Sequence, residues 1–478
     1  MIINNLSNIE KKKFYVIIIG SGPAGISTAL RLEEKKIETL LIEAGDINYR
    51  PESEEFLKVN SIGDHYGDLS GNRLRQFGGT SGLWGGNCNP MNYNNFFDWP
   101  IKKSDLDKYN DEASNILNLK ENFFLESLNE ELNIYNLAWS NVKFGKDYLE
   151  HIRKSKFIHL SLNSTFLSFN GKEKNISSIN CRKGNKDFKL MSKFFILSCG
   201  GIENSRLLLW SRYKDNKLFS SKLPIGNYYM HHPYHFVGNG IINYKKLNNY
   251  YSEKNIVNYP IVTCNSNLYV EASEQLLNEK NIINSGIYIN FKNINKNNDF
   301  IKQLSCVAPK FIKKLYDDIN AKDIYEIDVW TMQEQEPIKE NCIKLSDELD
   351  PYNIPLTKLI WKKLPSEIKS ARIIMEEIGN FFIKKEIGRL ALENHLYDQN
   401  VNYEAVSGNH QMGGTRIGIN EEDSVVDENL KIHGLNNLFV TGSSVFRTSG
   451  HSHPTFTIVQ LSLRLADHII QYKTKKNF

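Results

Sequence analysis

One N-terminal segment constrains the fold of this chain more than any other. An apolar run at residues 14–19 is typical of a parallel β-strand covered on both faces. It leads into a glycine-rich turn at residues 20–25, and a helical pattern follows over residues 26–34. A second short strand at residues 38–42 ends in Glu43, 23 residues after the first glycine. This order of strand, turn, helix, strand and acid predicts a βαβ unit that binds a dinucleotide.

The residues of this turn have separate tasks in such a unit. Gly20 permits the tight turn, Gly22 lets the backbone approach a pyrophosphate, and Gly25 allows the helix to pack closely. The carboxylate of Glu43 can accept hydrogen bonds from both ribose hydroxyls, and it repels the 2′-phosphate of NADP. The fingerprint by itself does not distinguish FAD from NAD. The residues expected to contact the dinucleotide here are Gly20, Ser21, Gly22, Pro23, Ala24, Gly25, Glu43 and Ala44.

Composition excludes several classes of function. The 478 residues include 59 Lys+Arg and 55 Asp+Glu with no concentrated basic face, so we expect no nucleic-acid partner. Six cysteines without a CxxC pair argue against a disulfide scaffold, a zinc ribbon or a dithiol centre. The chain has no run of 18 apolar residues, so we expect no membrane span. Lysines at 11–13 resemble the start of a signal peptide, but Gly20 ends the apolar run early, and we expect a cytoplasmic protein.

The strand patterns fall into three separated segments. Residues 14–45, 155–212 and 425–472 each carry strand or strand–helix patterns rich in β-branched and aromatic residues. Two long insertions lie between them, at residues 60–150 and 231–405. The expected architecture is therefore α/β. A parallel domain is assembled from the three segments, and a second, largely antiparallel domain is assembled from the insertions.

Local patterns within the insertions predict specific elements. The pair Ser104 and Asp107 has capping-box spacing and opens a helix that runs to about Leu117. Short strands are expected at residues 287–291 and 324–332. Residues 366–384 predict a helix with one apolar face, which is typical of core rather than of a binding site. Its apolar side chains are Ile368, Ala371, Ile374, Met375, Ile378 and Phe381.

Five further motifs follow in order. They are residues 75–86 (Arg-Gln-Phe-Gly-Gly-Thr-Ser-Gly-Leu-Trp-Gly-Gly), 195–207 (Phe-Ile-Leu-Ser-Cys-Gly-Gly-Ile-Glu-Asn-Ser-Arg-Leu), 226–233, 410–416 (His-Gln-Met-Gly-Gly-Thr-Arg), and 437–446 with 453–457. The first resembles the flavin-contacting loop of the glucose–methanol–choline (GMC) oxidoreductases, and the second resembles the strand and turn behind their FAD. The third resembles their short histidine–proline segment, the fourth their catalytic-histidine motif, and the last their closing signature.

This resemblance implies FAD as the dinucleotide. It implies a Rossmann-like FAD-binding domain of residues 1–60, 155–230 and 406–478. Residues 61–154 and 231–405 would form the flavin-loop insertion and a substrate-binding domain dominated by an antiparallel sheet. The further FAD contacts that it implies are Gly78, Gly79, Thr80, Ser81, Trp84, Gly85, Gly86, Gly442, Ser443, His453, Pro454 and Thr455.

Three positions depart from the family's pattern. Arg447 stands where proline is usual, and His453 stands where many members carry asparagine. Leu83 occupies the position at which some members carry a histidine bonded covalently to the flavin. We therefore expect FAD to be held without a covalent bond.

Two histidines are the expected catalytic residues. Oxidising an alcohol with a flavin moves a hydroxyl proton to a base and a hydride to flavin N5. Histidine suits the base because its pKa lies near neutral pH. The resemblance places His410 as the base and His453 beside the substrate oxygen, with the two roles exchangeable.

The resemblance is closest to the family's sugar-oxidising branch, through residues 333–347 and 410–416. It implies a sugar, cyclitol or similar polyol as substrate, and it leaves the electron acceptor open. Gln333, Glu334 and Gln335 are candidate partners for substrate hydroxyls, although a strand that exposes polar side chains to water fits the pattern equally well.

Other interpretations stay open. A flavin- and NAD-dependent reductase would need a second glycine fingerprint and usually a redox cysteine pair, and the sequence has neither. A non-catalytic module would bind flavin that no alcohol reduces. We expect no metal, because Pro233 disfavours the helix that would pair two of the clustered histidines. Glu203 and Arg206 are expected to be only an exposed pair on a helix. The clustered histidines are His231, His232, His235, His451 and His453.

Overall fold

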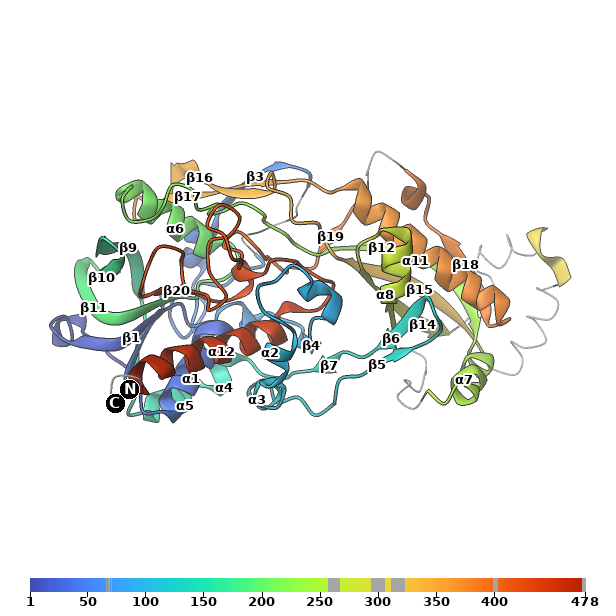
Figure 1. Ribbon diagram of the computed structural model, residues 1–478, viewed down its shortest axis with the longest axis horizontal. Helices are drawn as coiled ribbons and strands as arrows, with labels where there is room; N and C mark the ends of the chain where they lie inside the picture. Colours follow the sequence, from blue (N-terminus) through green and yellow to red (C-terminus); the bar gives the residue numbers. More distant parts are fainter. Residues whose placement is uncertain are drawn as a thin grey trace.

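Two large β-sheets organise the molecule and lie toward its opposite ends (Figure 1). The computed structural model describes residues 1–65, 67, 69, 71–256, 267–293, 306–310, 323–398 and 403–474. Helices and sheets are both abundant, so the fold is of the α/β class that the sequence predicts.

The first sheet has seven strands, which come from the three segments that the sequence predicts. Its order is β8-β2-β1-β11-β10-β9, and β20 pairs with the end of β11. The pairs β8–β2, β2–β1, β1–β11 and β11–β20 are parallel. The strands are β1 (Lys13–Ile19), β2 (Thr39–Ile42), β8 (Ile158–Ser161), β9 (Ser164–Lys172), β10 (Asn175–Lys183), β11 (Lys186–Leu197) and β20 (Leu438–Val440).

The sheet is not wholly parallel, which corrects the sequence prediction. β10 runs antiparallel to both β9 and the first half of β11. Only residues 173–174 and 184–185 connect these strands, and so short a connection cannot make the crossover that a parallel pair needs. Because β11 is 12 residues long, its first half pairs with β10 and its second half pairs with β1.

Two helices that are distant in sequence pack beside β1. This strand is central in the sheet, and its residues 16–18 are completely buried, as expected for a strand covered on both faces. Helix α1 (Pro23–Glu34) follows β1, and helix α12 (Pro454–Thr474) packs alongside α1 (Figure 1). Arg31 Nε of α1 lies 2.7 Å from Asp467 Oδ1 of α12. The C-terminal segment is thereby joined to the glycine turn.

The second sheet has eight antiparallel strands, as the sequence predicts for the insertions. Its order is β18-β12-β15-β14-β13-β6-β5, and β19 pairs with β12. The strands predicted at residues 287–291 and 324–332 lie within β14 and β15. The strands are β5 (Leu125–Ser127), β6 (Leu132–Tyr135), β12 (Pro233–Asn243), β13 (Asn267–Ala272), β14 (Ser285–Asn293), β15 (Ile324–Gln333), β18 (Gly388–Leu392) and β19 (Val406–Ser407).

Helix α11 (Pro365–Lys384) covers one face of this sheet (Figure 1). Its predicted apolar side chains are all buried, and all but Ile368 lie in one cluster with sheet residues such as Ile287 and Ile289, which confirms that this face is core. Side chains alternate along a strand, so Tyr288, between those two isoleucines, lies on the opposite face. The face of the sheet away from α11 is therefore the one left for the rest of the molecule.

The helix predicted from Ser104 to Leu117 is two helices instead. They are α2 (Ser104–Asp107) and α3 (Asn110–Ile116), and Tyr109 between them has a non-helical backbone. The hydroxyl of Tyr109 donates a hydrogen bond to Asp467 on α12 (3.1 Å). Ser104 makes no capping bond, and Asp105 instead accepts from the Lys102 N–H (2.9 Å). Contact with α12 thus interrupts the helical pattern.

The structure also bears on three features that the sequence argues against, namely a membrane-spanning helix, a metal site and disulfide bonds. Among the described residues, no helix is both long enough and apolar enough to cross a bilayer. Within the same ranges, no three His, Cys, Asp or Glu side chains are grouped so as to hold a metal ion. Cys264 lies outside the described residues, and the other five cysteines are free thiols.

Candidate active site

A cavity of about 590 Å³ lies where three parallel strands end. Its wall includes Gly20 after β1, Cys199 after β11 and Gly442 after β20. Ligands of open α/β sheets characteristically bind at the carboxyl ends of parallel strands. The cavity therefore occupies the position at which such a fold binds a cofactor.

Most of the predicted contact residues share this one wall. Of all the candidate cofactor and catalytic residues, only Gly25 and Gly78 do not line the cavity. The residues that line it are Gly20, Ser21, Gly22, Pro23, Ala24, Glu43, Ala44, Gly79, Thr80, Ser81, Trp84, Gly85, Gly86, His410, Gly442, Ser443, His453, Pro454 and Thr455.

The glycine turn forms an open cradle. A Cβ atom added at Gly22 would have no protein atom within 4 Å, so space beside this backbone is free. A Cβ at Gly25 would lie 2.1 Å from the carbonyl oxygen of Gly20, so this glycine is needed for packing within the turn. The free space faces the start of α1, where unpaired N–H groups and the helix dipole favour an anion.

Glu43 is buried beneath the turn and holds its shape. Its Oε2 accepts hydrogen bonds from the N–H (3.1 Å) and the hydroxyl (2.6 Å) of Ser21, and its Oε1 accepts from the Gly45 N–H (2.8 Å). Each carboxylate oxygen can accept more than one hydrogen bond. The carboxylate can therefore support the turn and still bind a polar group in the cavity.

The predicted flavin loop reaches the cavity from the other side. A Cβ at Gly79 would lie 3.0 Å from Gly22 Cα, so the loop packs directly on the glycine turn. Gly78 instead faces helix α4 (Phe144–Asp147), because a Cβ there would lie 2.1 Å from the Gly145 nitrogen. The Leu83 side chain is exposed in the cavity wall.

The two candidate catalytic histidines meet in this wall. Their ring centroids lie 5.0 Å apart at an interplanar angle of 72°. His453 directly precedes α12, and its N–H donates to Asn89 Oδ1 (2.9 Å). His410 lies on an irregular loop after β19. The two rings therefore come from different elements and converge on one space.

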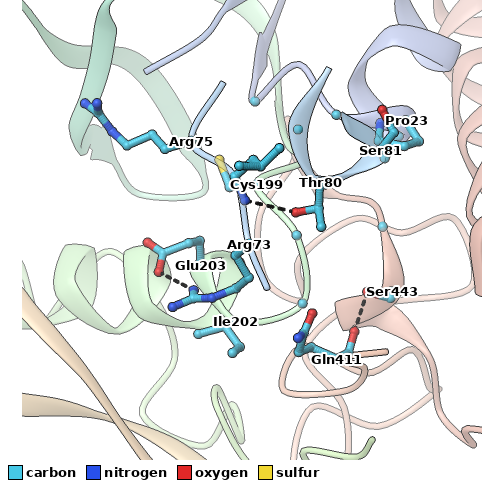
Figure 2. Close-up of a pocket in the computed structure, with 18 of the residues that line it drawn as sticks. Pro23, Arg73, Arg75, Thr80, Ser81, Cys199, Ile202, Glu203, Gln411 and Ser443 are labelled. Carbon is cyan, nitrogen blue, oxygen red and sulfur yellow. Dashed lines mark hydrogen bonds and ion pairs between the residues drawn. The ribbon is translucent and has the colours of Figure 1, made fainter. Parts of the chain in front are cut away.

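The loop that carries His410 is held on both sides of the histidine. Asn409 Oδ1 accepts a hydrogen bond from Asn72 Nδ2 (2.8 Å), and Gln411 Nε2 donates to Asn72 Oδ1 (3.3 Å). The Gln411 carbonyl also accepts from the Ser443 hydroxyl (2.6 Å), as Figure 2 shows. These bonds fix the backbone at His410.

Both histidines are neutral imidazoles at neutral pH. Burial lowers the pKa of His410 well below its usual 6.5, and the neighbouring His453, His232 and His231 lower it further. Burial also lowers the pKa of His453, to about 4, with His451 as a smaller cause. The pKa values are thus lower than the near-neutral value expected from sequence. A neutral ring has a free lone pair and can accept a proton.

Glu203 and Arg206 are not the exposed pair that the sequence predicts. Arg206 is only 4% exposed, and its Nη1 donates to Glu203 Oε2 (2.9 Å) while its Nη2 donates to Asp350 Oδ2 (2.6 Å). Arg73 adds a second contact to Glu203 (Nη1 to Oε1, 3.2 Å), visible in Figure 2. All four residues line the cavity. The sequence could not show this, because Arg73 and Asp350 lie more than a hundred residues from their partners.

Residues 333–335 lie behind the cavity wall and do not line it. Gln333 and Gln335 are completely buried, so they do not form a strand face open to water. Gln335 Nε2 donates to Glu367 Oε1 (2.9 Å), and Gln333 Oε1 faces His235 Nε2 at 3.0 Å. Within the described structure these amides brace neighbouring side chains instead of presenting groups to a substrate.

A family model decides the identity of the fold. Residues 337–462 match the model of the GMC oxidoreductases, and the match includes both His410 and His453. The C-terminal part of the chain is therefore a GMC oxidoreductase domain. This confirms the resemblance carried by the motifs in the sequence.

Known proteins agree with this assignment. The chain is 31% identical over 159 residues to the fructose dehydrogenase large subunit of Gluconobacter japonicus. This alignment covers 33% of this chain and 28% of the relative. It is 24% identical over 332 residues to 2-methyl-1,2-propanediol dehydrogenase of Mycolicibacterium austroafricanum, covering 69% of this chain and 55% of the relative. The chain thus spans about half or less of the length of these curated relatives.

Solved structures share the fold of this chain over nearly its whole length. Pyridoxine 4-oxidase from Mesorbium loti superposes with a TM-score of 0.58 at 14% identity, covering 95% of this chain and 99% of that one. A formate oxidase superposes with a TM-score of 0.58 at 13% identity, covering 98% and 99%. At this identity the likeness establishes the fold alone.

One neighbour of the two candidate catalytic histidines did not emerge from sequence as a site residue. His232 is completely buried, and its Nδ1 lies 2.9 Å from Nδ1 of His410. In the sequence, His232 stands out only as one of the clustered histidines that could suggest a metal. Its place in the histidine–proline segment directly before β12 is the one signal that pointed toward the site.

Glu367, the buried partner of Gln335, gives a prediction for stability. Burial raises the pKa of this carboxyl to about 8, although the hydrogen bond from Gln335 lowers the pKa in part. The folded protein therefore keeps a proton between about pH 4.5 and pH 8 that the unfolded chain has released, so stability falls as pH rises through this window. At 1.36 kcal/mol per pH unit, the free energy of unfolding of the parent should fall by roughly 3–5 kcal/mol across this window. Glu367→Gln cannot ionise at this position and should not show this fall.

The measurement is the urea midpoint of both proteins at pH 5 and pH 8. The urea midpoint of Glu367→Gln should exceed that of the parent only at pH 8. Glu376→Gln, on the exposed side of the same helix, is the matched control and should follow the parent at both values. Equal pH dependence of the parent and Glu367→Gln would refute the assignment.

Proposed function

We propose that this chain is an FAD-dependent oxidoreductase that oxidises an alcohol group. The observation that carries the proposal is the pair of neutral histidine rings, His410 and His453, in the wall of a cavity built on a dinucleotide turn. The turn supplies a place for a pyrophosphate, and the histidines supply a proton acceptor and a hydrogen-bond donor. Their coexistence in one cavity matches what alcohol oxidation by a flavin requires.

The residues present fit FAD. The free space at Gly22, the N-terminus of α1 and the carboxylate of Glu43 would hold the adenosine diphosphate part. The loop at residues 79–86 and the turn Gly442–Ser443 would hold the rest, because both line the same cavity. FAD, when bound, supplies the hydride acceptor.

The chain's own residues supply the proton chemistry. His410 would take the hydroxyl proton, since its neutral ring has a free lone pair. The Nδ1 atom of His453 is buried without a partner among the described residues, so its Nε2 is the atom left for the substrate oxygen. A hydrogen bond there strengthens as negative charge grows on that oxygen, and such bonds contribute to rate.

The substrate that we propose is a polyhydroxylated ring. Met332 lines the cavity, and it pairs with Gly286 and Tyr234 on the sheet face away from α11. Aromatic rings continue along that face: Tyr234 stacks on Trp330 (centroids 5.2 Å) and packs edge-on against Tyr288 (5.8 Å). Aromatic walls with a few polar groups are typical of small-molecule sites, and the CH faces of a sugar ring pack well on them.

Polar atoms without partners lie at the same end of the sheet. The buried Nδ1 of His451 has no hydrogen bond among the described residues, and it lies close to Gly286, where a Cβ atom would be 2.8 Å away. A small aliphatic alcohol has no further hydroxyl to offer such an atom. A polyol does, and the fructose substrate named for one relative is of this kind.

A panel of alcohols tests the substrate class. Holoenzyme is mixed without oxygen with sugars, cyclitols, methanol, choline and a sterol, and the rate of loss of flavin absorbance is measured for each. A sugar or cyclitol should give the fastest loss. Faster reduction by methanol, choline or the sterol would overturn the substrate class while leaving alcohol oxidation in place.

We also propose that FAD is held without a covalent bond. The side chain of Leu83 lies in the cavity wall and cannot form the histidyl link found in some relatives of this family. Acid precipitation should therefore release all of the flavin into the supernatant. Yellow colour that stays in the washed pellet would contradict this.

A further inference from the structure

A direct contact between two imidazole rings lies behind the candidate base. His232 Nδ1 and His410 Nδ1 are 2.9 Å apart, and the rings stand at 89° to each other. On its other side, His232 Nε2 lies 3.3 Å from the carbonyl oxygen of Ser449. His232 therefore bridges the base and a backbone acceptor.

The protons of this bridge can be assigned from its partners. A carbonyl oxygen only accepts hydrogen bonds, so His232 Nε2 must carry a proton to bond to Ser449. A neutral imidazole carries one proton, so His232 Nδ1 is then a bare acceptor. His410 Nδ1 must donate to it, which leaves the other nitrogen of His410 without a proton.

We infer that His232 is a positioning residue that holds His410 in its Nδ1–H form, so that the bare Nε2 of His410 faces the cavity. The catalytic meaning of this inference rests on the proposed function, because a bare Nε2 matters most if His410 is the base. A neighbouring hydrogen bond is the general means by which proteins select one histidine tautomer.

Both rings are neutral, as the assignment requires. Burial lowers the pKa of His232 to about 3, and burial also lowers the pKa of His410. The nearest titratable side chains are further histidines, His231, His451 and His453, which oppose positive charge on this pair. Among the described residues, the carboxylate that bonds to one of these histidines is Glu271, which contacts His451 Nε2 (2.7 Å) and not the bridge.

The opposite assignment loses a hydrogen bond. If His232 donated from Nδ1, its bare Nε2 would face the bare carbonyl of Ser449, and two acceptors would meet in a buried place. Ser449 cannot turn away, because its hydroxyl accepts from the Gln335 N–H (2.9 Å) and donates to the Gln335 carbonyl (3.3 Å). The acceptor that orients His232 is therefore itself fixed.

Nitrogen-15 NMR of the holoenzyme with ¹⁵N-labelled histidine tests the inference without any substrate. Protonated and bare imidazole nitrogens have well-separated shifts, and the His410 signals are identified by their loss in His410→Gln. In the unaltered protein, Nδ1 of His410 should be protonated and Nε2 bare. A proton on Nε2 in that protein overturns the inference by itself, whether or not the variants fold.

Two substitutions at His232 then test the cause. His232→Phe keeps the ring but has no acceptor, so the Nε2–H form of His410 should appear. His232→Asn places an amide oxygen near the Nδ1 position, so it should restore the Nδ1–H form. The control is His395→Asn, because the half-buried His395 bonds to His235 outside the cavity wall, and this change should leave His410 unchanged. An unchanged His410 in His232→Phe would also overturn the inference.

Kinetics separates this inference from the proposed function. With the fastest sugar or cyclitol of the panel, flavin reduction should slow roughly 10-fold or more in His232→Phe, less than the roughly 10²–10⁴-fold expected for loss of the base, and recover in His232→Asn. If no alcohol reduces the flavin although NMR shows the Nδ1–H form, the proposed function fails and the tautomer assignment stands. If reduction is fast but His410 carries its proton on Nε2, the function stands and the role of His232 is wrong.

Discussion

Replacing His410 with alanine should slow the reduction of the flavin by an alcohol by roughly 10²–10⁴-fold, the usual contribution of a general base. The reason is that no other group takes over its position. His232 is buried behind it, and in the proposed mechanism the Nε2 of His453 would bond to the substrate oxygen. The measurement is the anaerobic rate of flavin reduction, with FAD content checked for each protein.

His453 should matter less than His410. His453→Ala removes one hydrogen bond to the developing charge, and His453→Asn should keep more activity than His453→Ala because an amide can still donate. A larger loss in His453→Ala than in His410→Ala would exchange the two roles. Near-normal reduction in both alanine variants, with FAD bound, would remove the pair from the mechanism.

The second large effect is expected at the glycine turn. In Gly22→Ala the new methyl group meets no protein atom within 4 Å, so the apoprotein should fold as before. It would fill the space assigned to the pyrophosphate. Steric overlap of this kind costs about 1–3 kcal/mol, so the FAD dissociation constant should rise roughly 5- to 150-fold.

Two other glycines separate this effect from a general loss of stability. Gly25→Ala should destabilise even the apoprotein, because its Cβ would lie 2.1 Å from the Gly20 carbonyl. Gly379→Ala, within α11 and 4.0 Å from its nearest neighbour, should leave FAD affinity unchanged and slightly stabilise the helix. Unchanged FAD affinity in Gly22→Ala would show that the pyrophosphate does not lie at this turn.

The sequence predicts local patterns of this fold well. The run before Gly20 predicts a central strand, and β1 is one. The apolar spacing from Ile368 to Phe381 predicts a buried helix face, and α11 buries it. Such features depend on neighbouring residues, whose periodicity is written directly in the chain. The motifs place His410 and His453 together for a similar reason, since each motif is short and continuous.

Features that depend on distant contacts could not be predicted in this way. Tyr109, at the break between α2 and α3, bonds to Asp467, and the buried Arg206 bonds to Asp350, both far away in sequence. The bridge from His232 to His410 likewise joins residues 178 positions apart. A pairwise contact between separate elements leaves no periodic trace in either of them. For the same reason, the sequence could not show that the Gln333 side chain bonds to other protein groups and is not available to a substrate.

The most direct test of the account is anaerobic mixing of the FAD-loaded protein with sugars and cyclitols while flavin absorbance near about 450 nm, a property of the cofactor, is followed. If the protein oxidises an alcohol, at least one of these compounds should remove the absorbance completely. One molecule of its carbonyl product should be recovered for each flavin reduced. A flavin that stays oxidised with every alcohol in the panel would contradict the account and would leave a protein that binds flavin without oxidising an alcohol.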